Sequence, residues 1–226
     1  MHEPGFSECL SAASPRLGRR AAPEPTDPVG SWVARTMTAV TGASDADFET
    51  GVIGGPTLHD DTIRLVEHDP AWPERFEQEA ARIRALLGPA ALRVDHVGST
   101  SVPGLAAKPI IDVVLTVVDS SDDAAYVPAL EAAGYVLRAR EPEWFEHRLL
   151  NAPDADVNLH VFSAGCSEID RMIRFRDHLR VDEAECVLYS RTKRDLAARR
   201  WRYVQDYADA KTDVIVDIMT RAQPLQ

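Results

Sequence analysis

The sequence has few of the features that mark secreted, membrane-bound or nucleic-acid-binding proteins. Its three cysteines, Cys9, Cys166 and Cys186, are far apart, which indicates neither a disulfide framework nor a zinc motif and predicts a reducing, cytoplasmic location. No apolar run reaches the ~18–20 residues of a membrane span, and no signal peptide is visible. The 25 Lys and Arg against 36 Asp and Glu leave a formal net charge of -11, which argues against general nucleic-acid binding.

What the chain does contain is one ordinary domain behind an N-terminal region of different composition. Residues 1–58 are dominated by small, polar, glycine and proline residues. Apolar side chains are too sparse there to offset the entropy lost when the backbone orders. We therefore expect a disordered N-terminal extension over 1–58 and a globular domain over 59–226. Alternatively, the extension docks a protein partner.

The domain mixes helical and strand patterns. Helical periodicity follows the turn at 69–73 and ends at Gly88, and an almost unbroken β-branched run at 110–118 is typical of a strand buried on both faces. Further strands are expected at 62–66, 92–97, 135–139, 146–151 and 157–162, and further helices at 122–133, 168–179, 183–199 and 204–222. Residues 99–105 are expected to form a turn that leads into a short helix. This order predicts an α/β (α+β) fold, in which a mixed β-sheet with flanking helices is closed by a C-terminal helical pair.

The segment that carries chemistry is 96–114. A strand ends there at Gly98, and glycine permits a tight turn and a close approach of the backbone to another group. The hydroxyl residues Ser99, Thr100 and Ser101 would then open a helix, whose free N–H groups favour a phosphate. An ordinary capped turn would use the same residue types.

The next strand carries a single charged residue, Asp112, in an otherwise apolar run. A buried carboxylate is costly unless it is paired, solvated or bound to a metal. A salt bridge with Arg93 or Lys108 would satisfy Asp112. Alternatively, the turn and the carboxylate would together hold a metal–nucleotide complex, with Lys108 among the phosphate-binding residues.

Several blocks, in order along 65–222, give the chain a specific resemblance. The central block is HVGSTSVPGL at 96–105, which is followed by KPIID at 108–112. The other blocks are VEHDPAWP at 66–73 with Phe76, NLHV at 158–161, FRDHLR at 175–180, and Tyr207 with Lys211. On these blocks the chain resembles the GrpB (UPF0157) family. The Gly-Ser turn followed by a strand aspartate is similar to the signature of the nucleotidyltransferase superfamily.

The resemblance implies a nucleotidyltransferase-like fold and roles for individual residues. Gly98 and Ser99 would grip the phosphates of a nucleotide, and Asp112 would be a catalytic, metal-binding carboxylate. The expected metal is Mg²⁺ or Mn²⁺. Active members of the superfamily clamp two metals with an Asp-x-Asp or Asp-x-Glu pair and a third carboxylate on a later strand.

The sequence departs from that superfamily at the other ligand positions. The second carboxylate position is Val114, which cannot bind a metal, and the later strand offers Asn158 and His160. A site made of Asp112 with His160, or with His96, would suit Zn²⁺ or Mn²⁺ better than Mg²⁺ because it contains an imidazole. An active enzyme needs a further carboxylate near Asp112. The candidates are Asp95, Glu146 and Asp156.

Near the C-terminus, Tyr207 and Lys211 lie four residues apart, on one face of the expected last helix. In related enzymes such a pair can meet the base or the phosphates of the nucleotide, and Lys193 and Arg194 could join it. Alternatively, Lys211 is a solvated surface residue. We interpret the basic and aromatic run at 199–203 as a turn between helices with its tryptophan packed inward, rather than as a nucleic-acid patch.

Two functions stay open at this level. In the first, the chain binds a nucleoside triphosphate or another phosphorylated small molecule and, as an enzyme, transfers a nucleotidyl group to an acceptor. In the second, the fold is inactive and serves as a binding or folding-helper module for a protein partner. Members of the resembled family occur fused to dephospho-coenzyme A kinase. No kinase loop of the form Gly-x-x-x-x-Gly-Lys-Ser/Thr is present, so the chain is not that kinase.

Overall fold

The computed structural model describes residues 52–53, 58–154 and 156–222. The N-terminal extension expected over 1–58 falls almost entirely outside these residues. Among the helices that the structure describes, none is long and apolar enough to cross a membrane.

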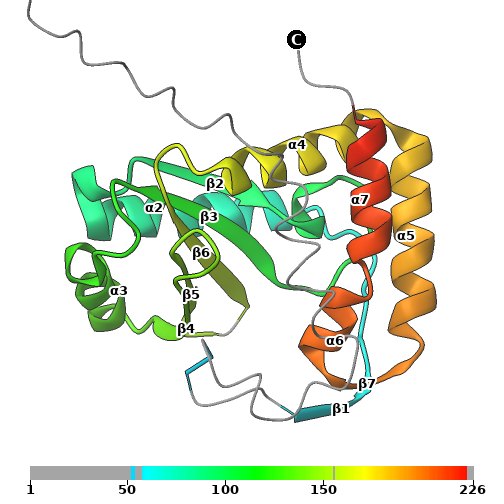
Figure 1. The fold of residues 1–226 in the computed structure, drawn as a ribbon, viewed down its shortest axis with the longest axis horizontal. Coiled ribbons are helices and arrows are strands. Elements are labelled where there is room, and N and C mark those ends of the chain that lie inside the picture. Colours follow the sequence, from blue (N-terminus) through cyan, green and yellow to red (C-terminus); the bar gives the residue numbers. More distant parts are fainter. Residues whose placement is uncertain (1–51, 54–57, 155, 223–226) are drawn as a thin grey trace, which may run out of the picture.

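A five-stranded mixed sheet forms the centre of the molecule (Figure 1). Its strands, in spatial order, are β2 (Arg93–Val97), β3 (Ile111–Val117), β6 (Val157–Ser163), β5 (His147–Asn151) and β4 (Val136–Glu141). β3 and β6 are parallel, whereas the other neighbouring strands are antiparallel. The mixed α/β architecture predicted from the sequence is confirmed.

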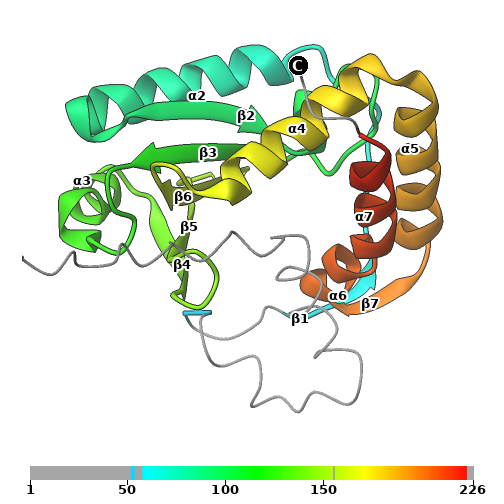
Figure 2. The same cartoon turned by 45° about the horizontal axis from the view of Figure 1, so that its top comes forward.

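Helices cover both faces of this sheet (Figures 1 and 2). The α-helices of the described residues are α2 (Trp72–Leu87), α3 (Val127–Ala132), α4 (Ser167–Val181), α5 (Glu183–Ala197), α6 (Val204–Asp209) and α7 (Thr212–Arg221), of which α2, α3 and α4 cover the sheet. Apolar residues of α2 and α3 join the main core on one face. On the opposite face, Ile169 of α4 packs in a cluster with Val97 and Phe162. α5, α6 and α7 lie together beside the end of the sheet at which β2 ends and β3 begins.

β3 is buried on both faces, as its β-branched run predicts. Val113 and Leu115 lie in the core under α2 and α3, whereas Val114 lies on the α4 side. Asp112 is only partly buried, and it shares a face with Val114 because alternate residues of a strand point to the same side. The α4 side of the sheet therefore carries the candidate carboxylate.

The expected strand at 62–66 is wrong. The first strand is β1 (Leu58–Thr62), which pairs antiparallel with β7 (Arg200–Tyr203) in a separate two-stranded sheet. Local periodicity misses this sheet because its two strands come from opposite ends of the domain.

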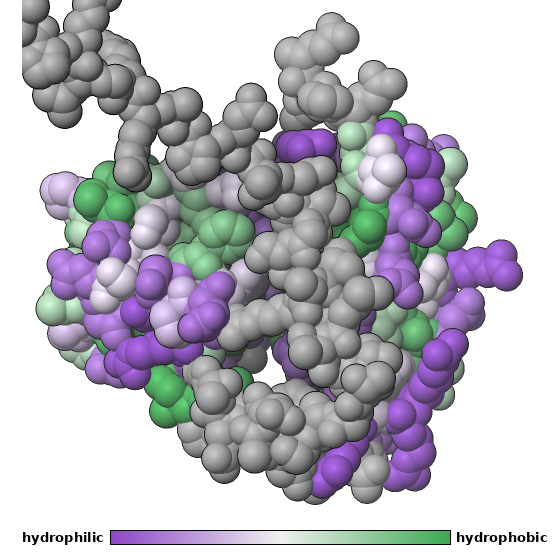
Figure 3. Space-filling view, viewed as in Figure 1, coloured by the Kyte–Doolittle hydropathy of each residue, from purple (hydrophilic) through white to green (hydrophobic). Residues whose placement is uncertain are grey.

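The basic and aromatic run at 199–203 is therefore mostly strand β7 rather than a turn. Its tryptophan does pack inward, since Trp201 Nε1 donates to the carbonyl oxygen of Leu196 at 2.8 Å. Hydrophilic residues gather over this corner of the surface, where α5 leads into β7 (Figure 3). The exposed cations there are Arg199, Arg200 and Arg202.

The turn expected within 99–105 is present, but the short helix expected to follow it is not. The structure has a single 3₁₀ turn over Ser99–Ser101. Pro103 disfavours a helical conformation for the residue before it, and Val102 is accordingly extended, with φ -103° and ψ 115°. The hydroxyl residues thus lie in a tight turn, not at the start of a regular helix.

Two other expected helices are divided. The segment 122–133 begins with a 3₁₀ turn over Asp123–Ala125, and α3 starts afterwards with Pro128 in its first turn. The segment 204–222 is broken between α6 and α7, where Asp213 in the first turn favours a new helix start. The remaining elements agree with expectation to within about two residues at each end, the usual spread of helix boundaries.

Candidate functional site

The turn that follows β2 lies directly against Asp112. Gly98 has φ +67°, a left-handed conformation that favours glycine. A β-carbon added at Gly98 would overlap the Asp112 carboxylate. Glycine is therefore needed here both for the turn and for the close approach of backbone and carboxylate.

The three hydroxyl residues of this turn have different partners. Ser101 Oγ donates to the carbonyl oxygen of Gly98 at 2.6 Å, and Thr100 Oγ1 lies 3.1 Å from His96 Nε2. Thr100 and Ser101 are buried, so their hydroxyl groups stabilise the turn itself. Ser99 Oγ instead accepts a hydrogen bond of 2.8 Å from Lys193 Nζ on α5. The structure therefore places Ser99 beside a cationic side chain.

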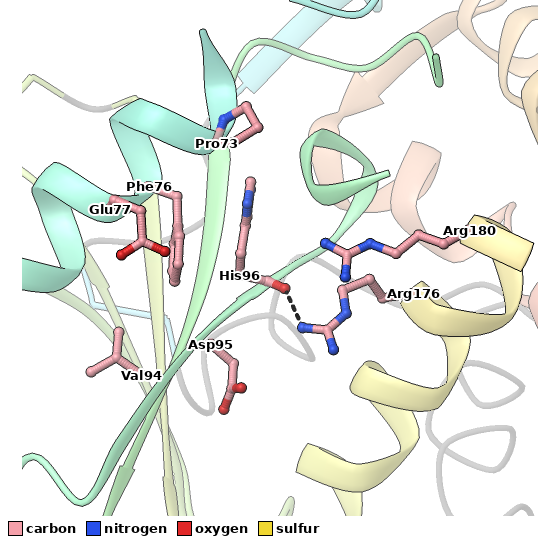
Figure 4. A pocket seen from close by; sticks show the side chains of 8 residues that line it. All are labelled: Pro73, Phe76, Glu77, Val94, Asp95, His96, Arg176 and Arg180. Carbon is pink, nitrogen blue, oxygen red and sulfur yellow. Dashed lines mark hydrogen bonds between the residues drawn. The ribbon is translucent and has the colours of Figure 1, made fainter. Parts of the chain in front are cut away.

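Two arginines of α4 donate hydrogen bonds to backbone carbonyl groups at the two ends of the segment that contains the turn (Figure 4). Arg176 Nη1 donates to the carbonyl oxygen of His96 at 2.9 Å, and Arg180 donates to that of Ser101 through Nε and Nη2, at 3.0 and 2.8 Å. Asp177 forms ion pairs with both arginines, at 2.7 and 3.4 Å. The FRDHLR block thus positions the turn, a role that the sequence pattern did not predict.

All three lysines of this 226-residue chain lie within electrostatic range of Asp112, the carboxylate that packs against the turn. Lys193 is 2% exposed, and its Nζ donates to Ser99 Oγ at 2.8 Å and to the carbonyl oxygen of Ala106 at 2.5 Å. Burial, followed by the positive charge of Lys211, lowers the pKa of Lys193 to about 7. Lys193 therefore lies at the centre of the site, although the sequence indicated it only as a neighbour of the last helix.

Lys108 and Lys211 complete what we call the lysine cluster, which consists of Lys108, Lys193 and Lys211. Burial, followed by the charge of Lys108, lowers the pKa of Lys211 to about 8. Lys211 Nζ lies 4.6 Å from the centre of the Tyr207 ring, so this pair stays together although the helix is broken between α6 and α7. Burial also lowers the pKa of Lys108, against an opposing effect of Asp112. Lys211 is half-buried rather than a solvated surface residue.

Two hydroxyl groups next to Lys211 lack partners. Tyr207 Oη and Thr212 Oγ1 are buried and, within the part of the chain that the structure describes, accept or donate no hydrogen bond. A buried polar group without a partner is costly and normally finds one in protein, water or ligand. Both hydroxyl groups are therefore available to an oxygen-rich ligand.

Asp112 is the carboxylate that faces the lysine cluster. Asn158 Nδ2 donates to Asp112 Oδ1 at 2.9 Å, and His160 Nε2 lies 3.9 Å from the same oxygen, beyond hydrogen-bond distance. Burial alone would raise the pKa of Asp112, but the interactions with His160 and Asn158 and the charge of Lys108 outweigh burial and lower it. The carboxylate is therefore ionised at neutral pH.

A row of polar side chains extends from Asp112 across the sheet. His160 Nδ1 lies 3.1 Å from His147 Nε2, and His147 Nδ1 lies 2.8 Å from Glu141 Oε2. Burial lowers the pKa of His147 to about 4, so its ring is neutral at physiological pH. Glu141 and His147 were not predicted from the sequence. The signal that could have found them is the register of β4, β5 and β6, in which Glu141 pairs with His147.

A cavity of about 410 Å³ opens beside Lys108. Its lining combines two cationic side chains and one carboxylate with apolar side chains, and consists of Ile63, Arg64, Lys108, Pro109, Ile110, Asp156 and Val204. Pockets for small molecules are commonly about 300–1,000 Å³, so this space suits a ligand of nucleotide size.

A family model described as GrpB protein matches residues 62–221, which include the turn, Asp112 and the whole lysine cluster. The chain belongs to the GrpB family. A UPF0157 protein of Halalkalibacterium halodurans is 56% identical over 182 residues, which cover 80% of this chain and 93% of that protein. A UPF0157 protein of Streptomyces coelicolor is 44% identical over 187 residues, 82% of this chain and 97% of that protein.

A solved structure, that of the GrpB protein of Enterococcus faecalis, is similar to this GrpB-family chain at 32% identity with a TM-score of 0.62. The match covers 70% of this chain and 96% of that one. The family resemblance stated from the sequence blocks is thus confirmed.

The candidate carboxylates of this GrpB-family chain all have basic partners. Asp156 pairs with Arg75, Asp95 pairs with Arg93 at 2.8 Å, and Glu146 lies 3.7 Å from Arg148. The second carboxylate position is the fully buried Val114. In the described ranges, no three His, Cys, Asp or Glu side chains are grouped to hold a metal.

His96 and His160 differ in their position relative to Asp112. His96 stacks on Phe76 of α2, with 4.7 Å between the ring centres, and pairs with Val113 on β3. It therefore points to the α2 side of the sheet, whereas Asp112 points to the α4 side. Of the two histidines, His160 is the one that the GrpB fold brings next to Asp112.

Proposed function

We propose that this protein binds a nucleoside triphosphate or another phosphorylated small molecule at the Gly98–Ser99 turn and the lysine cluster. The observation that carries the proposal is the position of the lysines. A chain with a formal net charge of -11 has three lysines; one contacts the turn, and all three lie within electrostatic range of Asp112 beside it. A polyphosphate is the small ligand whose charge matches this arrangement.

The electrostatics of the cluster support an anionic ligand. The charge of Lys211 lowers the pKa of Lys193, and the charge of Lys108 lowers that of Lys211. Asp112 raises the pKa of all three lysines and so opposes these effects, but it supplies a single negative charge. Hydrogen bonds to charged groups contribute about 1.5–3 kcal/mol each, so three ammonium groups can hold phosphates firmly. The cavity beside Lys108 provides space for the rest of the ligand.

Asp112 would hold a divalent cation, Mg²⁺ or Mn²⁺, on the bound phosphates. Its carboxylate is ionised and 30% exposed, and Asn158 and His160 lie beside it, which suits a single cation site. A cation there would neutralise phosphate charge. The proposal is binding rather than two-metal nucleotidyl transfer, because the second ligand position carries Val114.

Titration calorimetry with inorganic triphosphate, and then with ATP, GTP, CTP and UTP, tests the proposal. Each ligand is measured with and without Mg²⁺. Lys211→Gln should weaken the affinity for triphosphate about 10- to 150-fold, the loss expected when one charge-assisted contact disappears. Arg191→Gln is the matched control, because it removes one positive charge from the exposed side of α5.

The expected control result is an unchanged affinity for triphosphate. Equal affinities in Lys211→Gln and the wild type, or no binding of any of these ligands to the folded wild-type protein, would contradict the proposal. A thermal-shift measurement is an independent check, since a ligand at 100 times its Kd adds about 2.7 kcal/mol to the stability of the native state.

A further inference from the structure

The cavity beside Lys108 lies at the end of the sheet that carries Asp112. Two of its lining residues, Ile110 and Asp156, directly precede β3 and β6. Hydrogen bonding joins these two segments, since Ile111 N donates to the carbonyl oxygen of Asp156 at 2.8 Å. Asp112 follows Ile110 by two residues. A ligand whose phosphates contact the lysine cluster therefore has this cavity next to it.

The walls of the cavity are mostly apolar. Four of its seven lining residues are apolar, and they come from three separate parts of the sequence: Ile63, Pro109, Ile110 and Val204. Nucleotide-binding proteins commonly hold a base between aromatic or apolar side chains, because the faces of the ring are then removed from water. The cavity is therefore suited to the base of a nucleotide.

Asp156 supplies the cavity with a hydrogen-bond acceptor. Arg75 Nη2 on α2 donates to Asp156 Oδ2, which anchors the carboxylate. The other carboxylate oxygen, Oδ1, has no partner among the described residues. The Asp156 side chain is 36% exposed, so a ligand can reach it. An ionised carboxylate only accepts hydrogen bonds, and it accepts two neighbouring donors well.

Arg64 supplies the cavity with donors. It is exposed, and within the part of the chain that the structure describes its side chain forms neither an ion pair nor a hydrogen bond. A guanidinium group carries five N–H donors and no acceptor. The polar part of the lining thus offers a planar donor group and a carboxylate acceptor, in addition to the ammonium group of Lys108.

Guanine is the base whose edges match both of these groups. Its N1–H and 2-amino groups are adjacent donors that suit a carboxylate, and its O6 and N7 atoms are adjacent acceptors that suit an arginine. Adenine carries an amino group in place of O6, so a donor would meet the donors of Arg64. Uracil would bring carbonyl oxygens toward the Asp156 carboxylate, and cytosine has no N7.

We propose that the cavity beside Lys108 binds the base of the nucleotide and selects guanine, with Asp156 accepting from N1–H and the 2-amino group and Arg64 donating to O6 and N7. The inference rests on the proposed function and deepens it, because it names the base of the ligand. Arg75 is a positioning residue, since it holds the Asp156 carboxylate without lining the cavity.

Titration calorimetry compares GTP with ATP, CTP, UTP and xanthosine triphosphate (XTP), with inorganic triphosphate as the reference that lacks a base. The wild type should bind GTP about 5- to 150-fold more tightly than ATP, the range expected for one well-formed pair of hydrogen bonds to a base. XTP has a carbonyl group where guanine has its 2-amino group, so it should also bind more weakly than GTP.

Variants assign the contacts to individual residues. Asp156→Asn should reverse the preference between GTP and XTP, because the amide accepts from N1–H and donates to the new carbonyl group. Asp154→Asn is the matched control: it makes the same change of charge at an exposed residue outside the lining, and should keep the preference for GTP. Arg64→Gln should reduce the ratio of GTP to ATP affinity, whereas Arg191→Gln should not.

Equal affinities of the wild type for GTP, ATP and UTP would overturn the inference and leave the proposed function intact. A GTP preference that Asp156→Asn retains would overturn the role of Asp156. If a variant does not fold, the comparison of the five nucleotides in the wild type still decides whether guanine is selected. A folded wild-type protein that binds neither inorganic triphosphate nor any nucleotide would overturn the inference together with the proposed function.

Discussion

The ligand-free protein should become more stable as the pH rises from 7 to 8.5, and Lys193 should be the main cause. The pKa of this lysine is 10.5 in its ordinary state and about 7 in the folded protein, where burial disfavours the charged form. Over this window the unfolded chain binds more protons than the folded one, so the free energy of unfolding increases with pH. The cost of burying the Lys193 charge is complete below about pH 7 and decreases as the pH rises from the folded pKa toward the ordinary value of 10.5.

The two pKa values give the magnitude of this effect. The cost of burying the Lys193 charge is about 4 kcal/mol at pH 7 and about 3 kcal/mol at pH 8.5, so the free energy of unfolding should rise by about 1–2 kcal/mol. The window ends at pH 8.5 because burial raises the pKa of Cys166 and Cys186. Above that pH these thiols ionise in the unfolded chain, which favours unfolding.

Urea unfolding at constant ionic strength, repeated at several pH values, measures the change. The comparison is with Lys193→Met, which keeps a long side chain and removes the ammonium group. Between pH 7 and 8.5 the free energy of unfolding of this variant should rise by about 1–2 kcal/mol less than that of the wild type, because the titrating group is absent. Parallel pH dependences in the variant and the wild type would refute the reasoning.

Three further predictions concern the turn, the carboxylate and the lysine cluster. In urea unfolding, Gly98→Ala should destabilise the protein more than Gly104→Ala. Both replace a left-handed glycine, at a cost of about 1–2 kcal/mol, but only at Gly98 would the new methyl group overlap Asp112. In calorimetry, Asp112→Asn should remove the gain in ATP affinity that a divalent cation provides, and should not weaken metal-free binding of inorganic triphosphate. The affinity of the wild type for triphosphate should fall at least ~10-fold between pH 7 and 9, as Lys193 and Lys211 lose their protons, which is opposite to the trend in stability.

The elements that the sequence predicted well have local causes. The β3 run is apolar and β-branched along its length, and the apolar residues of α2 recur at helical spacing up to the stop at Gly88. The pairing of β1 with β7 has no such local cause, since each strand is defined by hydrogen bonds to a distant segment. The break between α6 and α7 contains neither glycine nor proline, so the strongest local signals for a helix end are missing there.

The same distinction between local sequence patterns and contacts of distant segments applies to the candidate site. Gly98 and Asp112 are close in sequence and could be predicted as neighbours, whereas Lys108, Lys193 and Lys211 meet because α5 and the start of α7 fold back on the turn. A lysine in water has a pKa near 10.4 and indicates nothing about a ligand. At 2% exposure, Lys193 lowers the stability of the ligand-free protein, and the charge of Lys211 adds to that effect. An anion bound at the turn would stabilise the charged form of each lysine and offset the free energy lost on burial. The position of the three lysines beside Asp112, more than the Gly-Ser motif, therefore supports a phosphate site.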